Sequence, residues 1–326
     1  MQILVTGAAG YIGSHVVKQL LEQTNYEIII IDNLCTGFET TIDTLKSLDK
    51  SASRIKYYNQ DLSDWKKVED IFKENDIKEI IHFAASLVVP ESVEQPLKYY
   101  LNNTANTASL IQTATKYGVN KFIFSSTAAV YGEPNKEDIP VSETTRTSPI
   151  NPYGSSKLFS ESVIKDTAFA NETFKFVILR YFNVAGADVD GKIGQSTLNA
   201  THLIKVAAET ALNKRAKMSI FGDDYDTQDG TCIRDYIHVC DLADAHLKAL
   251  KYLDANPSDI FNCGYGYGYS VKEVIDTMKK VSNTDFKVDI VPRRAGDPST
   301  LISNNTKIKT KMNWTPKYND LELICK

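Results

Sequence analysis

The feature of this sequence that most constrains its fold is a regular alternation of short apolar runs with longer helical stretches through the first 180 residues. The apolar runs predict strands over 3–5, 27–31, 55–58, 80–83, 121–125 and 176–179. Helices are predicted from about residue 12, where apolar residues recur every four positions, and over 65–75, 97–117 and 153–170. Because apolar strands that alternate with helices need cover on both faces, the pattern predicts a doubly wound parallel α/β sheet.

The second half of the chain has a different rhythm. Segment 185–201 is rich in Gly, Asp and Asn and has no clear period. Helices are predicted over 201–212 and 241–253, the second with Asp241 as its N-cap, and Ser270 and Glu273 form a capping box that opens another. Strands are predicted over 219–221 and 288–291. We expect residues 1–180 to form the main domain and residues 181–326 a smaller α+β lobe, with some elements returning to the main sheet.

Charge and composition exclude several classes of function. A formal net charge of −4 without a basic cluster gives little support for nucleic-acid binding. The longest apolar runs, such as 28–31, are far too short to span a bilayer, and the sequence opens directly on a strand-like run without features of a signal peptide. A cytoplasmic enzyme is the simplest interpretation.

Cysteine and histidine spacing does not favour a metal site. The five cysteines lack C-x-x-C pairing, so free thiols are expected and no metal is predicted. His82, His238 and His246 lie in apolar surroundings, which is typical of histidines with a structural role.

Three glycines at the first strand–helix junction predict a dinucleotide site. Gly7, Gly10 and Gly13 allow a tight turn and a close approach of the backbone to a pyrophosphate at the helix N-terminus. A glycine triple alone is often only a turn, but its position after the first strand favours this Rossmann-type interpretation. Asp32 closes the second strand, where a carboxylate accepts hydrogen bonds from both adenosine ribose hydroxyls and repels a 2′-phosphate, which favours NAD over NADP. The alternative for Asp32 is a turn or cap residue.

A tyrosine and a lysine four residues apart supply a candidate proton-transfer device. On a helix, Tyr153 and Lys157 share one face. A free phenol has a pKa of about 10, and we expect the lysine ammonium and an oxidised nicotinamide ring to lower it. Thr127 ends the run 125–127 at the close of the fifth strand, at the ligand-facing edge, where its hydroxyl can relay a proton. A solvated helix face is the alternative for the pair.

Arginines mark candidate phosphate ligands in the second half of the chain. Arg180 follows the sixth strand, and Arg234, Arg293 and Arg294 lie further along. Guanidinium groups bind phosphate through two hydrogen bonds at once. Surface salt bridging is the alternative for each of them.

Taken together, these residues resemble the extended short-chain dehydrogenase/reductase family and, within it, the UDP-glucose 4-epimerase family. The resemblance covers about residues 1–321. The segments that carry it are 6–15, 32–35, 82–85, 130–132, 180–183, 220–225 and 229–239, of which the last two are the most specific.

The resemblance implies a tightly held NAD that is reduced and reoxidised within each turnover. Tyr153 would take the proton of the sugar 4-hydroxyl while hydride leaves C4, and the 4-keto sugar would turn over and take the hydride back on its other face. Lys157 would hold the nicotinamide ribose and lower the tyrosine pKa, and Thr127 would share the proton. By the same resemblance the cofactor site comprises Gly7, Gly10, Tyr11, Ile12, Gly13, Asp32, Asn33, Asp61, Leu62, Phe83, Ala84, Ala85, Asn102, Lys157 and Phe182.

The resemblance also implies a substrate site and a quaternary state. The UDP-sugar would be held by Thr127, Tyr153, Asn183, Asn199, Phe221, Arg234, Arg294 and Asp297. Members of the family are usually homodimers. The stretches 97–117 and 153–170 suit such pairing, and packing on the protein's own core explains them equally well.

Several alternatives stay open on the sequence alone. Dehydratases and decarboxylases on this scaffold keep acidic residues after the catalytic Ser/Thr, and here Ala128 and Ala129 stand there. Leu301 stands where some members carry a tyrosine, which leaves acceptance of N-acetylated sugars open. An epimerase acting on UDP-glucuronate needs a cation for the sugar carboxylate. A catalytically silent NAD-binding protein is the alternative from another class, and such proteins tend to lose the tyrosine or the lysine.

Overall fold

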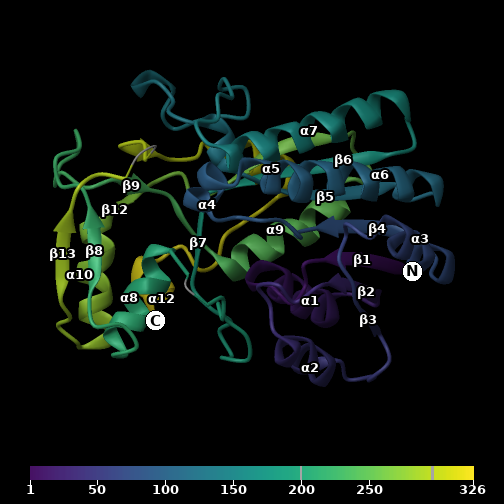
Figure 1. Cartoon of the computed structure of the whole chain (residues 1–326), viewed down its shortest axis with the longest axis horizontal. Helices are drawn as coiled ribbons and strands as arrows, with labels where there is room; N and C mark the ends of the chain where they lie inside the picture. The colour runs from purple at the N-terminus through teal and green to yellow at the C-terminus, as the bar shows by residue number, and fades with distance from the viewer. Residues whose placement is uncertain (199, 295–296) are drawn as a thin grey trace.

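The computed structural model describes residues 1–198, 200–294 and 297–326 (Figure 1). Its centre is a parallel sheet that, among the described residues, has the strand order β11-β6-β5-β4-β1-β2-β3. The strands are β1 (Gln2–Thr6), β2 (Glu27–Asp32), β3 (Ile55–Asn59), β4 (Ile77–His82), β5 (Lys121–Thr127), β6 (Lys175–Tyr181) and β11 (Asp259–Cys263). The predicted doubly wound α/β fold is confirmed.

Two layers of helices cover the two faces of this sheet, because successive side chains of each strand point in opposite directions. On β1, Ile3 and Val5 pack in one apolar cluster, while Leu4 packs in another. The first cluster includes residues of α1 (Tyr11–Gln23), α2 (Glu39–Leu48) and α9 (Val239–Tyr252). The second includes residues of α3 (Trp65–Glu74), α6 (Asn106–Lys116) and α7 (Pro152–Ala170).

The register of the sheet brings the carboxyl ends of its central strands together. Thr6 at the end of β1 pairs with Ile31 of β2 on one side and with His82 of β4 on the other. His82 in turn pairs with Phe124 of β5. The residues that follow these strands therefore meet at one edge, where ligands bind in open parallel sheets.

Helix α7 begins where the sequence supplies standard start signals. The Asn151 side chain accepts a hydrogen bond from the Gly154 backbone N–H at 2.9 Å, and Pro152 occupies the first helical position. The helix contains the whole predicted stretch 153–170.

The stretch 97–117 is helical but not uniform. It comprises α5 (Pro96–Tyr99), a π-helical segment η1 (Tyr100–Ala105) and α6 (Asn106–Lys116). The Asn103 side chain in η1 bonds both the backbone N–H and the C=O of Ser86, and it also bonds the Ser156 hydroxyl on α7. π-Helical turns recur at functional sites, and this one ties the segment after β4 to α7.

One predicted helix boundary is wrong. Asp241 is not the N-cap of α9, because the helix begins at Val239 and His238 is its cap, accepting from the Cys240 N–H at 3.1 Å. The Asp241 carboxylate instead accepts hydrogen bonds from the Tyr265 hydroxyl and from the Lys317 and Tyr318 backbone N–H groups. A carboxylate in the first helical turn thus serves to fasten a later segment of the chain.

The second lobe lies beside the carboxyl end of the sheet (Figure 1). It contains β8 (Met218–Phe221) paired with β13 (Val288–Val291), and β9 (Ile233–Arg234) between β12 (Tyr269–Ser270) and β14 (Thr300–Leu301). Its helices are α8 (Leu203–Ala211), α10 (Val271–Ser282) and α12 (Leu321–Cys325), and the predicted capping box opens α10.

Several elements of the second half return to the main sheet. Strand β11 extends it beside β6, α9 packs on α1, and α11 (Thr306–Met312) packs on β11. The remaining short elements are α4 (Val89–Glu94), η2 (Ala128–Tyr131), η3 (Lys136–Asp138), and the paired strands β7 (Asn183–Ala185) and β10 (Tyr236–His238). Within the part of the chain that the structure describes, no helix has the length and apolar character needed to cross a membrane.

Candidate active site

The turn after β1 is a backbone cradle that only glycines allow. Gly7 has φ +73°, and a Cβ built on it would lie 2.7 Å from the Ala84 backbone nitrogen. A Cβ on Gly13 would lie 2.3 Å from the Gly7 carbonyl oxygen. Gly10 is the N-cap of α1 and has no side chain to cap the helix, so N–H groups of its first turn are left for a ligand. This geometry fits the pyrophosphate of a dinucleotide.

Asp32 is placed for the adenosine ribose of such a cofactor. One of its carboxylate oxygens accepts from the Ala9 N–H and the other from the Leu34 N–H, each at 2.8 Å. Burial raises the pKa of Asp32, and these two backbone hydrogen bonds oppose the rise. Each oxygen retains a further lone pair and Asp32 lines the cavity, which suits a pair of ribose hydroxyls and disfavours a 2′-phosphate.

One cavity of about 750 Å³ joins the cradle to the second lobe. Most predicted cofactor residues line it: Gly7, Gly10, Tyr11, Ile12, Gly13, Asp32, Asn33, Asp61, Leu62, Phe83, Ala84, Ala85, Asn102 and Phe182. The predicted substrate residues that line it are Thr127, Tyr153, Asn183, Phe221, Arg234, Arg294 and Asp297. Asn199 lies outside the described residues.

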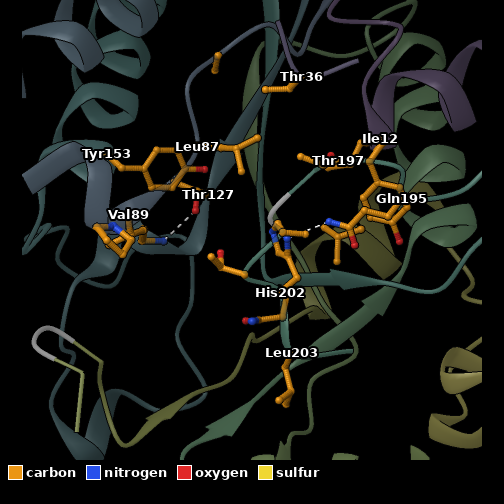
Figure 2. A pocket seen from close by; sticks show the side chains of 18 of the residues that line it. Ile12, Thr36, Leu87, Val89, Thr127, Tyr153, Gln195, Thr197, His202 and Leu203 are labelled. Carbon is orange, nitrogen blue, oxygen red and sulfur yellow. Dashed lines mark hydrogen bonds between the residues drawn. The ribbon is translucent and has the colours of Figure 1, made fainter. Parts of the chain in front are cut away.

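Tyr153 and Thr127 lie side by side on the cavity wall (Figure 2). The Thr127 Oγ1 accepts a hydrogen bond from the Ala129 N–H at 3.1 Å, which leaves its own proton free to point at the Tyr153 hydroxyl. Burial raises the pKa of Tyr153, and the Thr127 hydroxyl opposes the rise. The protein atoms alone therefore do not produce the lowered pKa that the sequence predicted.

Lys157 lies beneath the cavity wall rather than on it. Its side chain is buried, and its Nζ donates to the Ser125 carbonyl oxygen at 2.9 Å and lies 4.9 Å from the centre of the Phe124 ring. Burial lowers the pKa of Lys157 to about 7, and the Glu161 carboxylate opposes that shift. An amine whose charge is this easily lost is sensitive to any charge that arrives nearby.

The far end of the cavity is lined by cations and an aromatic ring. The Arg294 guanidinium lies 4.0 Å from the centre of the Phe221 ring. The Arg234 Nη1 donates to the Ile233 carbonyl oxygen at 2.9 Å, and its Nη2 lies 3.9 Å from an Asp297 carboxylate oxygen. This set is suited to a flat base and an anionic diphosphate.

Two of the arginines singled out in the sequence do not line the cavity. Arg180 forms a buried salt bridge with Glu161, and Arg293 pairs with Asp224 at the surface. The alternative of surface salt bridging holds for Arg293, whereas the salt bridge of Arg180 is buried.

The sequence argument also missed part of the cavity wall. Leu87, Val89, Gln195, Thr197, His202 and Leu203 line it as well (Figure 2). The Gln195 Nε2 and the His202 Nδ1 lie 2.9 Å apart in a hydrogen bond. The aperiodic segment 185–201 was the available signal, because long irregular loops at the ligand-facing edge of a sheet commonly contact the ligand.

Comparisons with known proteins agree with this geometry. The NAD dependent epimerase/dehydratase family profile matches residues 3–264. The UDP-glucose 4-epimerase of Lacticaseibacillus casei is 44% identical over 327 residues, which cover 99% of this chain and 94% of that protein.

Solved structures are similar over the whole length. The UDP-Glc/GlcNAc 4-epimerase from Campylobacter jejuni is 57% identical with a TM-score of 0.86, covering 99% of this chain and 96% of that one. The UDP-glucose 4-epimerase from Bifidobacterium longum, solved with NAD+ and UDP, is 36% identical with a TM-score of 0.94, covering 100% of this chain and 96% of that one. The chain therefore belongs to the NAD dependent epimerase/dehydratase family.

Proposed function

We propose that this protein is a UDP-glucose 4-epimerase that interconverts UDP-glucose and UDP-galactose with a bound NAD. The observation that carries the proposal is the single cavity that joins a dinucleotide cradle, a Tyr153–Thr127 pair and a cationic far end. A dehydratase or decarboxylase on this scaffold would carry acidic residues where Ala128 and Ala129 stand, and these alanines supply no acid or base.

The residues divide the chemistry between them. NAD supplies the hydride acceptor when bound, and its oxidised ring adds a positive charge that favours the phenolate of Tyr153. Tyr153 takes the proton of the sugar 4-hydroxyl and later returns it, and Thr127 shares that proton. Lys157, which is buried behind the cavity wall, stabilises the phenolate through its charge. The far end holds the UDP part through Asn183, Phe221, Arg234, Arg294 and Asp297, so that the sugar can turn over while it stays attached.

The cavity wall supports activity on N-acetylated sugars as well. Leu301, a branched aliphatic residue, lines the cavity where a tyrosine would be bulkier. The Campylobacter jejuni relative is described as a UDP-Glc/GlcNAc 4-epimerase. We include UDP-GlcNAc and UDP-GalNAc among the substrates.

The working form we propose is a cytoplasmic homodimer. Leu97 and Leu101 are 73% and 65% exposed, and Phe159 on α7 is 51% exposed beside them, stacked on Tyr100. Large apolar side chains gathered on neighbouring helices favour a partner surface. We further propose residues 1–180 as the NAD-binding part and most of 181–326 as the UDP-sugar-binding part.

The test is turnover of UDP-galactose by the purified protein without added NAD. We expect UDP-glucose to form, and UDP-GalNAc to be converted in a parallel reaction. Tyr153→Phe removes the proton acceptor and should lower kcat by about 10²–10⁴-fold, while the released NAD per chain stays as in the wild type. Failure of the wild type to convert either sugar while it holds NAD would contradict the proposal.

A further inference from the structure

Helix α7 presents three functional groups in one row to the end of strand β5. Tyr153, Lys157 and Glu161 are spaced four residues apart and so share a face of the helix. Tyr153 faces the Thr127 hydroxyl, and Lys157 donates to the Ser125 carbonyl oxygen. In the third contact of the row, the Glu161 Oε1 accepts from the Ser126 hydroxyl at 2.5 Å. Each of the last three residues of β5 thus fixes one residue of the row.

Glu161 is held from the other side by Arg180 of β6. The Arg180 Nε donates to the Glu161 Oε1 at 3.0 Å, and its Nη2 donates to the Glu161 Oε2 at 2.6 Å. The Glu161 side chain is 0% exposed and the Arg180 side chain 4%. Both partners of this two-bond pair are therefore charged in a water-free setting, where each depends on the other.

One further carboxylate lies close to the pair, that of Glu143, which acts on the same Tyr131 hydroxyl as Arg180. Arg180 also donates to the Tyr131 hydroxyl at 3.1 Å and to the Glu143 carbonyl oxygen at 3.4 Å. Around Lys157, β4 contributes His82, whose ring bonds Thr6 and Thr107 and whose pKa burial lowers to about 3. His82 is therefore neutral, and the charge that acts on Lys157 is that of the Glu161 carboxylate, which Arg180 balances.

We propose that Glu161 is a positioning residue for the Tyr153–Lys157 pair, which it serves in two ways. Through Ser126 it fixes α7 on the end of β5, and through Arg180 it keeps the net charge beside Lys157 at zero, so that the lysine can hold its proton in a buried place. The inference deepens the proposed epimerase, because a charged Lys157 is what stabilises the Tyr153 phenolate.

Two single substitutions separate an electrostatic role from a merely structural one. Glu161→Gln leaves Arg180 as an unbalanced buried cation, since arginine does not lose its proton. Lys157 should then lose its proton at lower pH, and the alkaline limb of the kcat profile should move down by about one pH unit. Arg180→Met leaves the carboxylate alone and should move the limb up. If the alkaline limb moves in the same direction in both variants, the electrostatic role is overturned.

The double variant Glu161→Gln/Arg180→Met restores charge balance. Its alkaline limb should return to the pH at which the wild type shows it. If the limb remains at the pH found for Glu161→Gln, the proposal is refuted. The double variant also carries the test if a single variant does not fold, because a neutral buried pair is tolerated far better than a lone buried charge. Asp166→Asn, which removes a carboxylate from the exposed part of α7, is the matched control and should shift nothing.

Ser126→Ala tests the positioning role in a protein that keeps the ion pair. It should lower kcat roughly tenfold with KM and the alkaline limb unchanged, and an unaltered kcat counts against the proposal.

A readout without substrate separates this inference from the proposed function. In the unfolded chain the lysine keeps its proton up to a pH of about 10.4. The melting temperature should therefore rise with pH once the pH exceeds the pKa of Lys157 in the folded state. That gain should begin about one pH unit lower in Glu161→Gln than in the double variant. Coincident melting curves contradict the inference even if the wild type converts no UDP-sugar.

Discussion

Gly7 shows how a cofactor site can depend on one backbone conformation. Its positive φ turns the chain after β1, and the absence of a side chain lets the turn approach Ala84 after β4. The glycine spacing predicted this turn, because a tight strand-to-helix junction leaves few residue types to choose from. The sequence could not predict that Lys157 lies beneath the wall or that Arg180 pairs with Glu161, since both depend on contacts between residues distant in the chain.

Gly7→Ala should abolish retention of NAD. The new Cβ would meet the Ala84 nitrogen at 2.7 Å, so the cradle must open. The matched control is Gly118→Ala, because Gly118 has a similar φ of +76° with nothing within 4 Å of the added Cβ. It should cost about 1 kcal/mol of stability and leave NAD content unchanged. NAD released per chain on denaturation measures both, and equal NAD content in the two variants would show that the close approach is unimportant.

At the scale of elements, periodic patterns predicted the strands of the main sheet in the first half and most of its helices, but not α2 and α4. They also failed where a side chain bonds a residue outside its own element. Asp241 resembled an N-cap, but its carboxylate fastens Tyr265 and the segment at 317–318. The π-helical turn in 100–105 was not predicted, because a single wide turn inside a helical stretch has no sequence signature of its own. Gln195 and Thr197 line the cavity but lie in a segment without a periodic pattern, so their place could not be predicted.

Leu101→Glu should convert the proposed homodimer to monomers. The substitution places a charge in the exposed apolar group on η1 and α7, and a charge buried in an interface without a partner is unfavourable. Leu212→Glu at the end of α8 is the matched control, since Leu212 is 67% exposed against 65% for Leu101. Light scattering coupled to gel filtration gives the mass of each variant. A wild type that elutes as a monomer would remove the basis for the prediction.

At the scale of the whole molecule, histidines that are buried in neutral form make the folded state less stable as the pH falls. Burial lowers the pKa of His15, His238 and His246 to about 4 and that of His82 to about 3. In the unfolded chain each has a pKa of about 6.5. The unfolded state therefore takes up these protons first as the pH falls, and the folded state does not follow until the pH approaches 4.

We accordingly expect the free energy of unfolding to fall steadily from pH 6.5 toward pH 4. Each such histidine contributes a slope of up to about 1.4 kcal/mol per pH unit. His15→Phe should reduce the slope because it removes one of these histidines. The ring stays aromatic, and the hydrogen bond that is lost is the one between His15 Nδ1 and the Tyr11 carbonyl oxygen, since Nε2 has no partner among the described residues. Urea titrations at several pH values provide the measurement. An equal slope in the variant would mean that His15 titrates alike in both states.

The place of β11 in the sheet has a consequence for how the protein is made. Strands β5 and β6, which carry Thr127 and Tyr181 at their ends, are complete once residue 181 has left the ribosome, but β11, the strand that covers the outer edge of β6, ends only at Cys263. During the synthesis of the intervening residues the nascent chain carries an apolar strand with an open edge, which is a template for pairing with other chains. Translation speed across this interval, and the chaperones present during it, will therefore influence the yield of folded enzyme more than they would for a protein whose sheet closes in sequence order.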